Sequence, residues 1–310
     1  LRIIARAYAL PGQPLFESEE AMAAIEKALP AMESKVLKMT GGVRQTPGNW
    51  WWWNLNTPPK LGFVLAVAEG NIDEGVYAVS LETLQWCLAH PLDWYMKGLT
   101  GQATNSIDAI KGNLYYAMLA GREEDIHYIM SEFEKTMTIA QRPYEGLMED
   151  GSYVAHNMID FYGYYNTFIL DSIRILDYVK DTDFMPGEEI MDGFSNALCN
   201  GASWAMFQGY RELSASGRNM HGPFTKETSA QIIEGLRFVA SQEGTYQMQA
   251  QAWLDQWESG YEMHTGHRYF YTGDFTIHKT QDSYVSVRTS SSSTIGGEAW
   301  GGNGQTNTYM

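Results

Sequence analysis

A long succession of amphipathic segments of medium length, joined by short connections, restricts the fold most strongly. In Ser18–Lys38, for example, apolar residues recur at helical spacing on one side and acidic residues stand at the front. The other predicted helices are Leu81–His90, Ser106–Ala120, Glu123–Thr138, Phe161–Val179, Glu188–Phe207, Lys226–Ala240 and Gln247–Glu258, with one more after Thr57 as N-cap. Such a series indicates stacked helical hairpins that close into a toroid or solenoid.

The pattern changes near Met263. The stretches Tyr269–His278 and Ser283–Arg288 alternate β-branched or aromatic residues with polar ones, which is the period of half-buried strands. A Ser/Gly-rich run follows them. We therefore predict a mainly α chain with a helical domain over residues 1–262. Over residues 263–310 we expect the first strands of a β domain that the chain does not complete.

Composition excludes some classes of function. The chain has 310 residues and a net charge of −16, which argues against a general nucleic-acid binder because such proteins rely on Lys and Arg. It contains no apolar run of about eighteen residues, so we expect no membrane span. Two cysteines, Cys87 and Cys199, are too few for a disulfide framework or a metal cluster. The chain opens and stops abruptly and shows no signal peptide, as a processed or truncated segment would.

The stretch from Asp150 to Asn166 concentrates aromatic rings, a histidine and carboxylates without any Lys or Arg. Asp150-Gly151-Ser152 predicts a turn. His156 then lies on a loop that leads into a helix with tyrosines on its first turn, where a scaffold tends to place chemistry. The structural alternative is an aromatic-rich helix start in which His and Tyr satisfy each other's hydrogen bonds.

Tryptophan is the second conspicuous signal. Four consecutive tryptophans, Trp50–Trp53, follow Asn49 and cannot all face one core, so some must be exposed or line a cleft. The high aromatic content suits a carbohydrate-binding groove, because sugar C–H faces stack on flat rings. It also suits an ordinary helical core, in which the tryptophans join one hairpin to the next.

Other candidate groups have simple structural explanations. Asn105 and Asp108 occupy a turn that runs into a helix, where capping is the structural alternative. A Gly/Pro-framed loop carries Arg218 and has the appearance of a surface loop. His264 and His267 are three apart but have no third ligand nearby in sequence, so chance explains them best. The adjacent carboxylates Glu149 and Asp150 could serve a glycosidase, although such pairs are common in turns.

The order of these motifs resembles polysaccharide lyase family 8, the bacterial hyaluronate, chondroitin and xanthan lyases. The series is Asn-Trp-Trp, Thr-Gly followed by Asn105, Asp-Gly-Ser-Tyr-x-x-His with a Tyr nine residues on, and Gly-Arg. The Ala-Tyr-Ala-Leu-Pro-Gly start, and Glu298 ahead of Asn303-Gly304, extend the resemblance over essentially the whole chain. It implies an incomplete (α/α) toroid followed by an antiparallel β-sandwich, most of which lies beyond this chain.

The resemblance also implies site residues. The catalytic set falls on Asn105, His156, Tyr165, Arg218 and Glu298, and the substrate-binding set on Asn49, Trp50, Trp51 and Asn303, with no metal. The chain departs from the family in three places. The position of a second arginine is Gly222, the loop before Asn105 is slightly longer, and Tyr164 adjoins Tyr165, which leaves the tyrosine ambiguous by one residue. Glu298 is expected within hydrogen-bonding reach of Arg218 or His156.

The implied reaction is β-elimination at a uronic acid, in which the C5 proton leaves and the C4–O bond breaks. Asn105 and His156 would hydrogen-bond the sugar carboxylate and spread the charge that develops there. A tyrosine with a reference pKa of about 10 can act as the base only if a nearby cation such as Arg218 stabilises the phenolate. This scheme requires no metal or organic cofactor.

We therefore predict a secreted or periplasmic polysaccharide lyase for polymers such as chondroitin or hyaluronan. We expect a monomer whose partner is an anionic polysaccharide, with no nucleic acid and no membrane. Because net charge governs only long-range approach, the cleft could still be locally positive. Two alternatives stay open: a glycoside hydrolase on an (α/α) barrel, which needs two carboxylates across its cleft, and a glycan-binding module without activity. Only a lyase would produce unsaturated uronates.

Overall fold

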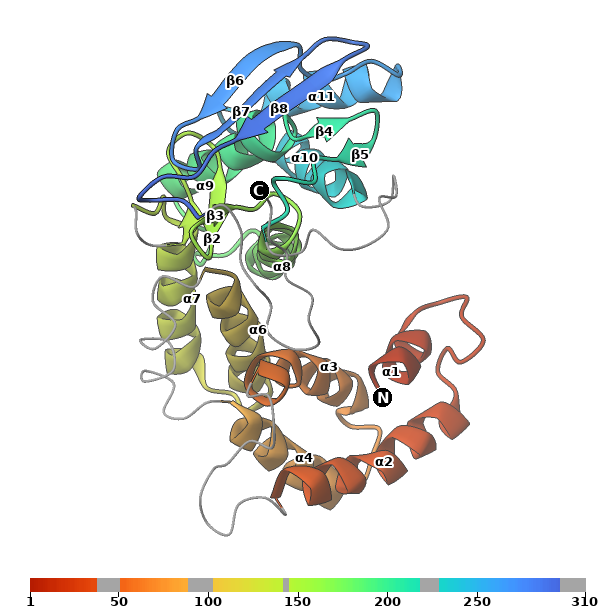
Figure 1. The fold of residues 1–310 in the computed structure, drawn as a ribbon. Helices are drawn as coiled ribbons and strands as arrows, with labels where there is room; N and C mark the ends of the chain where they lie inside the picture. The colour runs from red at the N-terminus through yellow and green to blue at the C-terminus, as the bar shows by residue number, and fades with distance from the viewer. Residues whose placement is uncertain (38–50, 89–102, 142–144, 218–228, 296–310) are drawn as a thin grey trace, which may run out of the picture. The chain divides into compact units, whose positions relative to one another are not determined.

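The computed structural model describes residues 1–37, 51–88, 103–141, 145–217 and 229–295, and within them the chain is mainly helical (Figure 1). The chain forms two compact units. The first comprises Leu1–Thr100 and Asn105–Phe133, and the second comprises Gly101–Thr104 and Glu134–Met310. No helix among the described residues is both long and apolar enough to cross a membrane.

The first unit is entirely helical in its described part. It contains α1 (Arg2–Ala9), α2 (Glu19–Leu37), a π-helical turn (Trp52–Asn56), α3 (Pro58–Ala68) and α4 (Glu74–Cys87), followed by most of α6 (Ala103–Leu119) and α7 (Glu123–Met137). Residues at helical spacing on α2 and α3, including Ile25, Leu29, Val64 and Leu65, are buried in one hydrophobic cluster with Leu84 of α4. The apolar spacing seen in the sequence therefore forms the core of this unit.

Two glycines allow close packing between helices of the first unit. A Cβ atom on Gly62 of α3 would overlap the Tyr115 side chain of α6, and one on Gly112 of α6 would overlap Pro58. The two helices therefore approach each other at distances that any larger residue would prevent.

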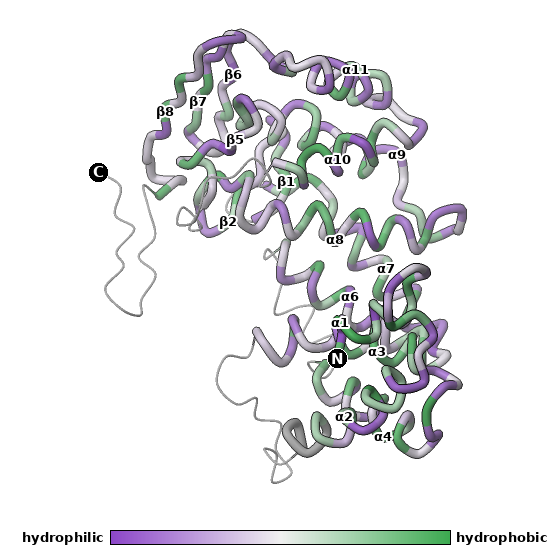
Figure 2. The backbone as a smooth tube through the Cα atoms, turned by 90° about the vertical axis from the view of Figure 1, so that its right-hand side faces the viewer, coloured by the Kyte–Doolittle hydropathy of each residue, from purple (hydrophilic) through white to green (hydrophobic). Residues whose placement is uncertain are grey.

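The second unit combines helices with three small antiparallel sheets. Its helices are α8 (Tyr164–Val179), α9 (Glu188–Asn196) with a π-helical continuation (Ala197–Ala202), α10 (Ala230–Ser241) and α11 (Gln247–Glu258). In Figure 2, α10 is coloured more hydrophobic than α11. Accordingly, α10 buries Ile232, Leu236 and Val239 among others, whereas the buried residues of α11 are Ala250 and Leu254.

The strands of the second unit are short. They are β1 (Gly146–Leu147), β2 (Tyr153–Ala155) and β3 (Met158–Ile159) in one sheet, β4 (Met206–Phe207) and β5 (Tyr210–Arg211) in a second, and β6 (Gly266–Phe270), β7 (Phe275–Lys279) and β8 (Tyr284–Arg288) in a third. The change from helices to the β6–β8 sheet occurs where the sequence predicts it. The compact units divide the chain elsewhere, because this sheet groups with α8 to α11.

Three local predictions need correction. Thr57 stands at the N-cap position of α3, but its side chain does not cap the helix: its φ and ψ are helical, and its hydroxyl donates to the Trp52 carbonyl at 2.7 Å. The predicted helix at Glu188–Phe207 ends earlier, because the chain widens into the π-helical turn and then enters β4. The stretch Tyr269–His278 is two strands, because a turn at Tyr271–Asp274 folds β7 back onto β6.

Candidate functional site

His156 occupies the tip of a tight β-hairpin. Val154 pairs with Ile159 and Ala155 with Met158, so His156 and Asn157 alone form the two-residue loop between β2 and β3. Both have positive φ, 53° and 57°, as a type I′ turn requires of its two central residues. A histidine in this region is uncommon, and such positions concentrate at functional sites. The loop predicted around His156 is therefore a hairpin that fixes the direction of its imidazole.

Two contacts hold the hairpin tip. The Glu145 carboxylate accepts a hydrogen bond from the backbone N–H of His156 at 2.6 Å. The imidazole of His156 stacks on the ring of Tyr164, with centroids 5.2 Å apart and planes inclined by 25°. Both rings are partly exposed, so a histidine and a phenol lie side by side where a ligand can approach them.

Asp160 connects this hairpin to α8. Its carboxylate accepts three backbone hydrogen bonds at the helix start, from Tyr162 at 3.2 Å, Gly163 at 2.5 Å and Tyr164 at 3.0 Å. These N–H groups have no partner within the helix, so the carboxylate does the work of an N-cap. Asp160 is fully buried, and this desolvation raises its pKa, although the three N–H donors and His156 oppose the shift.

The same carboxylate is close to the segment that leads to Arg218. Asp160 forms an isolated antiparallel bridge with Ser216, and the next residue, Phe161, donates its N–H to the Ala215 carbonyl at 2.6 Å. Gly217 has φ +54°, and a Cβ there would overlap the Asp160 carboxylate. Asp160 therefore fixes the start of α8 and the backbone just before Arg218 together.

Tyr165 has different surroundings from its neighbour. Its side chain is fully buried in an aromatic cluster with Tyr153 and Phe161, whose ring centroids lie 5.3 Å and 6.1 Å from its own. Its hydroxyl has no hydrogen-bond partner among the residues that the structure describes, and burial raises its pKa well above 10. A base needs the opposite shift. Thr104 of α6 contacts two other tyrosines of this region. Its hydroxyl lies 2.6 Å from the Tyr153 hydroxyl and donates to the Tyr164 carbonyl at 3.1 Å.

Two further predicted site residues belong to the first unit. Asn105 is partly buried on the first turns of α6, and Asp108 pairs with Lys111 at 2.9 Å, so neither residue is the N-cap of a helix that begins at Ala103. Trp51 is partly buried and meets Trp52 edge to face, with centroids 5.3 Å apart. Trp52 itself is 54% exposed, which confirms that the tryptophan run does not all enter the core.

The remaining predicted residues lie outside the described part of the chain: Asn49, Trp50, Arg218, Glu298 and Asn303. The expected contact of Glu298 with Arg218 or His156 therefore stays a prediction. Among the described residues no group of His, Cys, Asp and Glu could hold a metal ion. His264 and His267 have different surroundings: His264 is buried against Ser203, and His267 is exposed on β6.

The carboxylate pair that could have served a glycosidase has structural partners. Asp150 is buried and accepts hydrogen bonds from the Ser152 N–H and hydroxyl and from Thr272. Glu149 accepts from the Tyr271 hydroxyl at 3.3 Å. The Asp150-Gly151-Ser152 turn is therefore confirmed as an element that joins the hairpin region to the β6–β8 sheet.

Sequence reasoning missed Asp160 and Glu145. Asp160 stands four residues before Tyr164, within the stretch that carries the tyrosines, and an aspartate ahead of an apolar helix is an N-cap signal. Glu145 had no local signal, because its partner is eleven residues away across the β1–β2 turn.

Comparisons with known proteins identify the family of the chain. A family model of the polysaccharide lyase family 8 N-terminal alpha-helical domain matches residues 1–255. The hyaluronate lyase of Staphylococcus aureus is 22% identical over 228 residues, which cover 68% of this chain and 27% of that protein. Chondroitinase-AC of Pedobacter heparinus is 24% identical over 237 residues, which cover 74% of this chain and 32% of that protein. The chain thus spans less than a third of the length of these curated relatives.

Solved structures show the same fold. A chondroitinase AC lyase studied with oligosaccharides superposes with a TM-score of 0.77 at 20% identity, covering 94% of this chain and 42% of that one. The Streptomyces coelicolor A3 chondroitin AC lyase in complex with chondroitin sulphate superposes with a TM-score of 0.74 at 14% identity. The match covers 90% of this chain and 43% of that one. The predicted fold class, a mainly α chain of the (α/α) toroid type followed by antiparallel strands, is confirmed. Because the family model covers most of its residues, the chain belongs to polysaccharide lyase family 8.

Proposed function

We propose that the chain supplies the catalytic helical part of a polysaccharide lyase that cleaves uronic-acid polymers by β-elimination. The observation that carries this proposal is the stack of His156 on Tyr164, held between a hairpin tip of positive φ and a capped helix start. An imidazole beside a phenol offers both a donor to the sugar carboxylate and a group that can exchange a proton. Elimination needs these two functions together.

The proposed roles follow the order of charge development. His156 and Asn105 hydrogen-bond the uronate carboxylate, which gains negative charge when the C5 proton leaves. The tyrosine takes that proton and returns one to the leaving oxygen. Arg218 lowers the pKa of the phenol, and Glu298 orients Arg218 through paired hydrogen bonds. Trp50 and Trp51 stack on the sugars, and Asn49 and Asn303 hydrogen-bond them.

Tyr164 is the tyrosine that the geometry favours. Its ring contacts His156 and is partly exposed, whereas the hydroxyl of Tyr165 is enclosed in an apolar cluster that raises its pKa. The family resemblance assigns the role to Tyr165, nine residues after His156. Tyr165 would become the base only if its hydroxyl left the aromatic cluster.

The substrate class follows from the relatives, which are named as hyaluronate lyase and chondroitinase-AC. We propose a glycosaminoglycan such as chondroitin or hyaluronan as the substrate. We also propose a secreted or periplasmic location, because polysaccharides of this class are met outside the cell. We further propose a bacterial origin and a monomeric state.

The test is direct. The purified chain is incubated with chondroitin sulfates, hyaluronan and xanthan, and the ultraviolet absorbance of 4,5-unsaturated uronates is followed against a His156→Ala control. Absorbance that rises with one polymer and is lost in the control supports the proposal. New reducing ends without absorbance indicate a hydrolase, and polymer binding with neither signal indicates a glycan-binding module.

A further inference from the structure

A pocket lies in the second unit, and none of its described lining residues is assigned to the elimination site. It has a volume of about 650 Å³ and lies between the end of the π-helical turn, α11 and the start of β6. Its walls carry Trp204, Trp253, His264 and Arg268, and the exposed Tyr261 and Gln256 are also among its lining residues. Aromatic walls with a few fixed polar groups are typical of small-molecule sites.

The aromatic wall is built around His264. Its imidazole stacks on Trp204 at 4.6 Å and 16°, and Trp253 meets it at 4.4 Å and 60°. The Ser203 hydroxyl donates to the Cys199 carbonyl at 2.9 Å, so its 2.6 Å contact with Nε2 is satisfied when the imidazole is the donor. Nδ1 then keeps a lone pair. Burial, Lys279 and Arg268 lower the pKa of His264 to about 2, so the ring is neutral.

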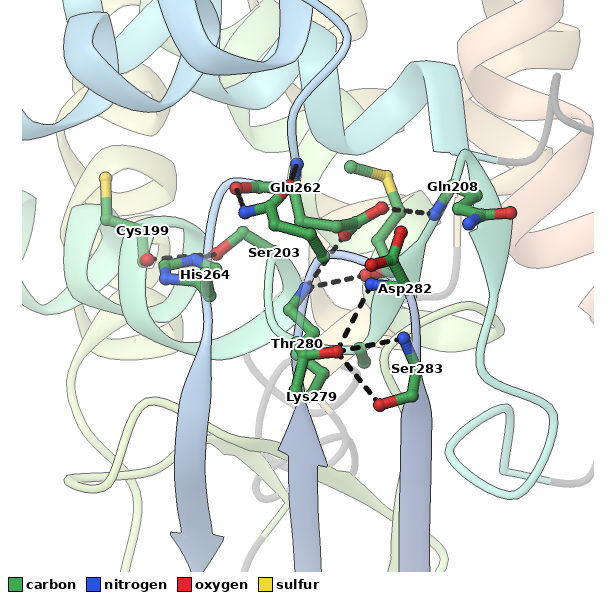
Figure 3. Close-up of polar contacts among 12 residues, drawn as sticks. Cys199, Ser203, Gln208, Glu262, His264, Lys279, Thr280, Asp282 and Ser283 are labelled. Carbon is green, nitrogen blue, oxygen red and sulfur yellow. Dashed lines mark hydrogen bonds and ion pairs between the residues drawn. The ribbon is translucent and has the colours of Figure 1, made fainter.

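The charges of the pocket do not cancel. Figure 3 shows the network around Glu262, whose carboxylate lies 3.3 Å from the Lys279 ammonium and accepts the Gln208 N–H at 2.6 Å. Because Lys279 is fully buried beside it, Glu262 is neutralised from within the protein. Arg268 is the other charged residue in the described lining, so the pocket presents a net positive group.

Two hydrogen-bond donors on the pocket walls have no acceptor among the described residues. They are Nε1 of Trp253 and Nε of Arg268. The other end of the guanidinium is fixed, because its Nη2 donates to the Asp150 carbonyl at 2.6 Å. A buried donor left without an acceptor destabilises the fold, because it has lost its hydrogen bond to water without gaining another. The two donor atoms have almost no contact with solvent, although the rest of each side chain is only partly buried on the pocket wall. A ligand that satisfies these two donors must therefore supply hydrogen-bond acceptors.

We propose that this pocket binds an acidic sugar unit, a uronate, of a polysaccharide or its oligosaccharide fragment. The carboxylate contacts Arg268, ring oxygens accept from Trp253, a sugar hydroxyl donates to Nδ1 of His264, and the exposed ring of Tyr261 stacks on a C–H face. The identity of the sugar rests on the proposed function, whereas the preference for an anionic, acceptor-rich ligand rests on the pocket itself. Such a site would hold the polymer away from the reacting bond.

The experiment reads binding at Trp253 and does not depend on cleavage. The chain is labelled with 5-fluorotryptophan, and the ¹⁹F resonance of Trp253 is assigned with Trp253→Phe. The probes are a chondroitin tetrasaccharide, cellotetraose as a neutral sugar, and sodium acetate as a simple anion. Gln256→Trp narrows the pocket mouth from an exposed position, and Met248→Trp, 85% exposed on the same helix and outside the pocket, is the matched control.

We expect the tetrasaccharide to shift the Trp253 resonance saturably, and cellotetraose to bind at least about tenfold more weakly. Gln256→Trp should weaken binding of the tetrasaccharide by a similar factor, whereas Met248→Trp should leave its binding unchanged. Arg268→Gln should remove the preference for the acidic sugar, with its folding checked by thermal melting. An unmoved resonance overturns the proposal, and so does equal binding of cellotetraose or acetate. A chain that binds here but yields no unsaturated product refutes the proposed elimination and not this pocket.

Discussion

Two buried carboxylates of the second unit solve the same electrostatic problem in different ways. Asp160 is surrounded by backbone N–H groups at the start of α8. Glu262 instead meets the buried ammonium of Lys279, which also donates to the Met206 carbonyl at 2.8 Å. Amides are fixed by the chain itself, whereas an ion pair needs two long side chains from separate elements.

The two carboxylates have different structural roles: Asp160 positions backbone near the proposed site, whereas Glu262 holds separate elements together. Around Asp160 the carboxylate determines where the backbone of Tyr164 and of Gly217 lies, beside residues proposed for chemistry. Around Glu262 the ion pair joins β7 to the β4 region and to the loop before β6, at the wall of the pocket proposed to bind a ligand. Substitutions in the first region should therefore affect turnover first, and those in the second should affect stability first.

The largest effect should come from Tyr164. Tyr164→Phe removes the proposed proton-transferring hydroxyl and should lower kcat by about 10²–10⁴-fold, while the melting temperature stays near that of the parent. Tyr165→Phe should retain activity and leave stability equal or higher, because it deletes a buried hydroxyl that has no partner in the described part of the chain. Steady-state rates and melting curves of both variants decide. If the two exchange behaviour, Tyr165 is the base.

Lys279→Met should give the largest loss of stability. It leaves the Glu262 carboxylate buried without its cation, which typically costs about 3–5 kcal/mol of unfolding free energy. Adding Glu262→Gln should recover part of that loss, because the amide oxygen can still accept the Gln208 N–H. Lys180→Met, at an exposed position, is the control. Denaturant titration measures all three. A Lys279→Met variant as stable as this control would show that the ion pair with Glu262 does not stabilise the second unit.

Asp160→Asn should combine both kinds of effect on a smaller scale. The amide replaces one acceptor oxygen by a donor that faces backbone N–H groups, at a cost of about 1–3 kcal/mol. Turnover should fall in parallel, because the backbone of Tyr164 and Gly217 loses its common anchor. Asp177→Asn, exposed on the same helix, should change neither. Undiminished activity in an Asp160→Asn chain that unfolds more easily would make Asp160 structural only.

The last effect concerns pH. The pKa of His264 is about 2 in the folded chain, against an ordinary value of 6.5, so below pH 6.5 the unfolded chain binds a proton that the folded chain does not. The stability from the neutral ring is complete above pH 6.5. It is lost at about 1.4 kcal/mol per pH unit as pH falls towards 2. Denaturant titrations at pH 7, 6 and 5 should show a shallower slope in His264→Phe than in the exposed His267→Gln. Equal slopes would mean that His264 is accessible to protons.

The helices could be predicted because their signal is local and repeated. The spacing of Ile25 and Leu29 on α2, or of Ile232 and Leu236 on α10, produces a buried stripe whatever the rest of the chain does. The exact ends were less predictable. Over Trp52–Asn56, just before Thr57, and over Ala197–Ala202 the backbone adopts π-helical turns, whose widened hydrogen bonding depends on packing and not on the residue types.

The sequence names candidate residues for the site, and these stay predictions, but it could not supply their geometry. The β2–β3 hairpin has strands of two and three residues, too short for alternation to show, and its turn residues His156-Asn157 lack the usual glycine. Asp160 and the pocket around His264 depend on contacts between segments distant in sequence, such as Ser203 with His264 across 61 positions. Pattern alone cannot supply such contacts.

The partners of Asp150 set a temporal order for folding during synthesis. Its carboxylate is bound by Thr272 and its carbonyl by Arg268, residues 122 and 118 positions later in the chain. When the ribosome has made the hairpin that carries His156, the turn in front of it still lacks these partners, and contacts of long sequence separation form slowly. A nascent chain stopped before β6 would carry every residue of the hairpin yet leave the Asp150 carboxylate without Thr272. The hairpin should therefore reach its final rigidity only after the first β-strands have emerged.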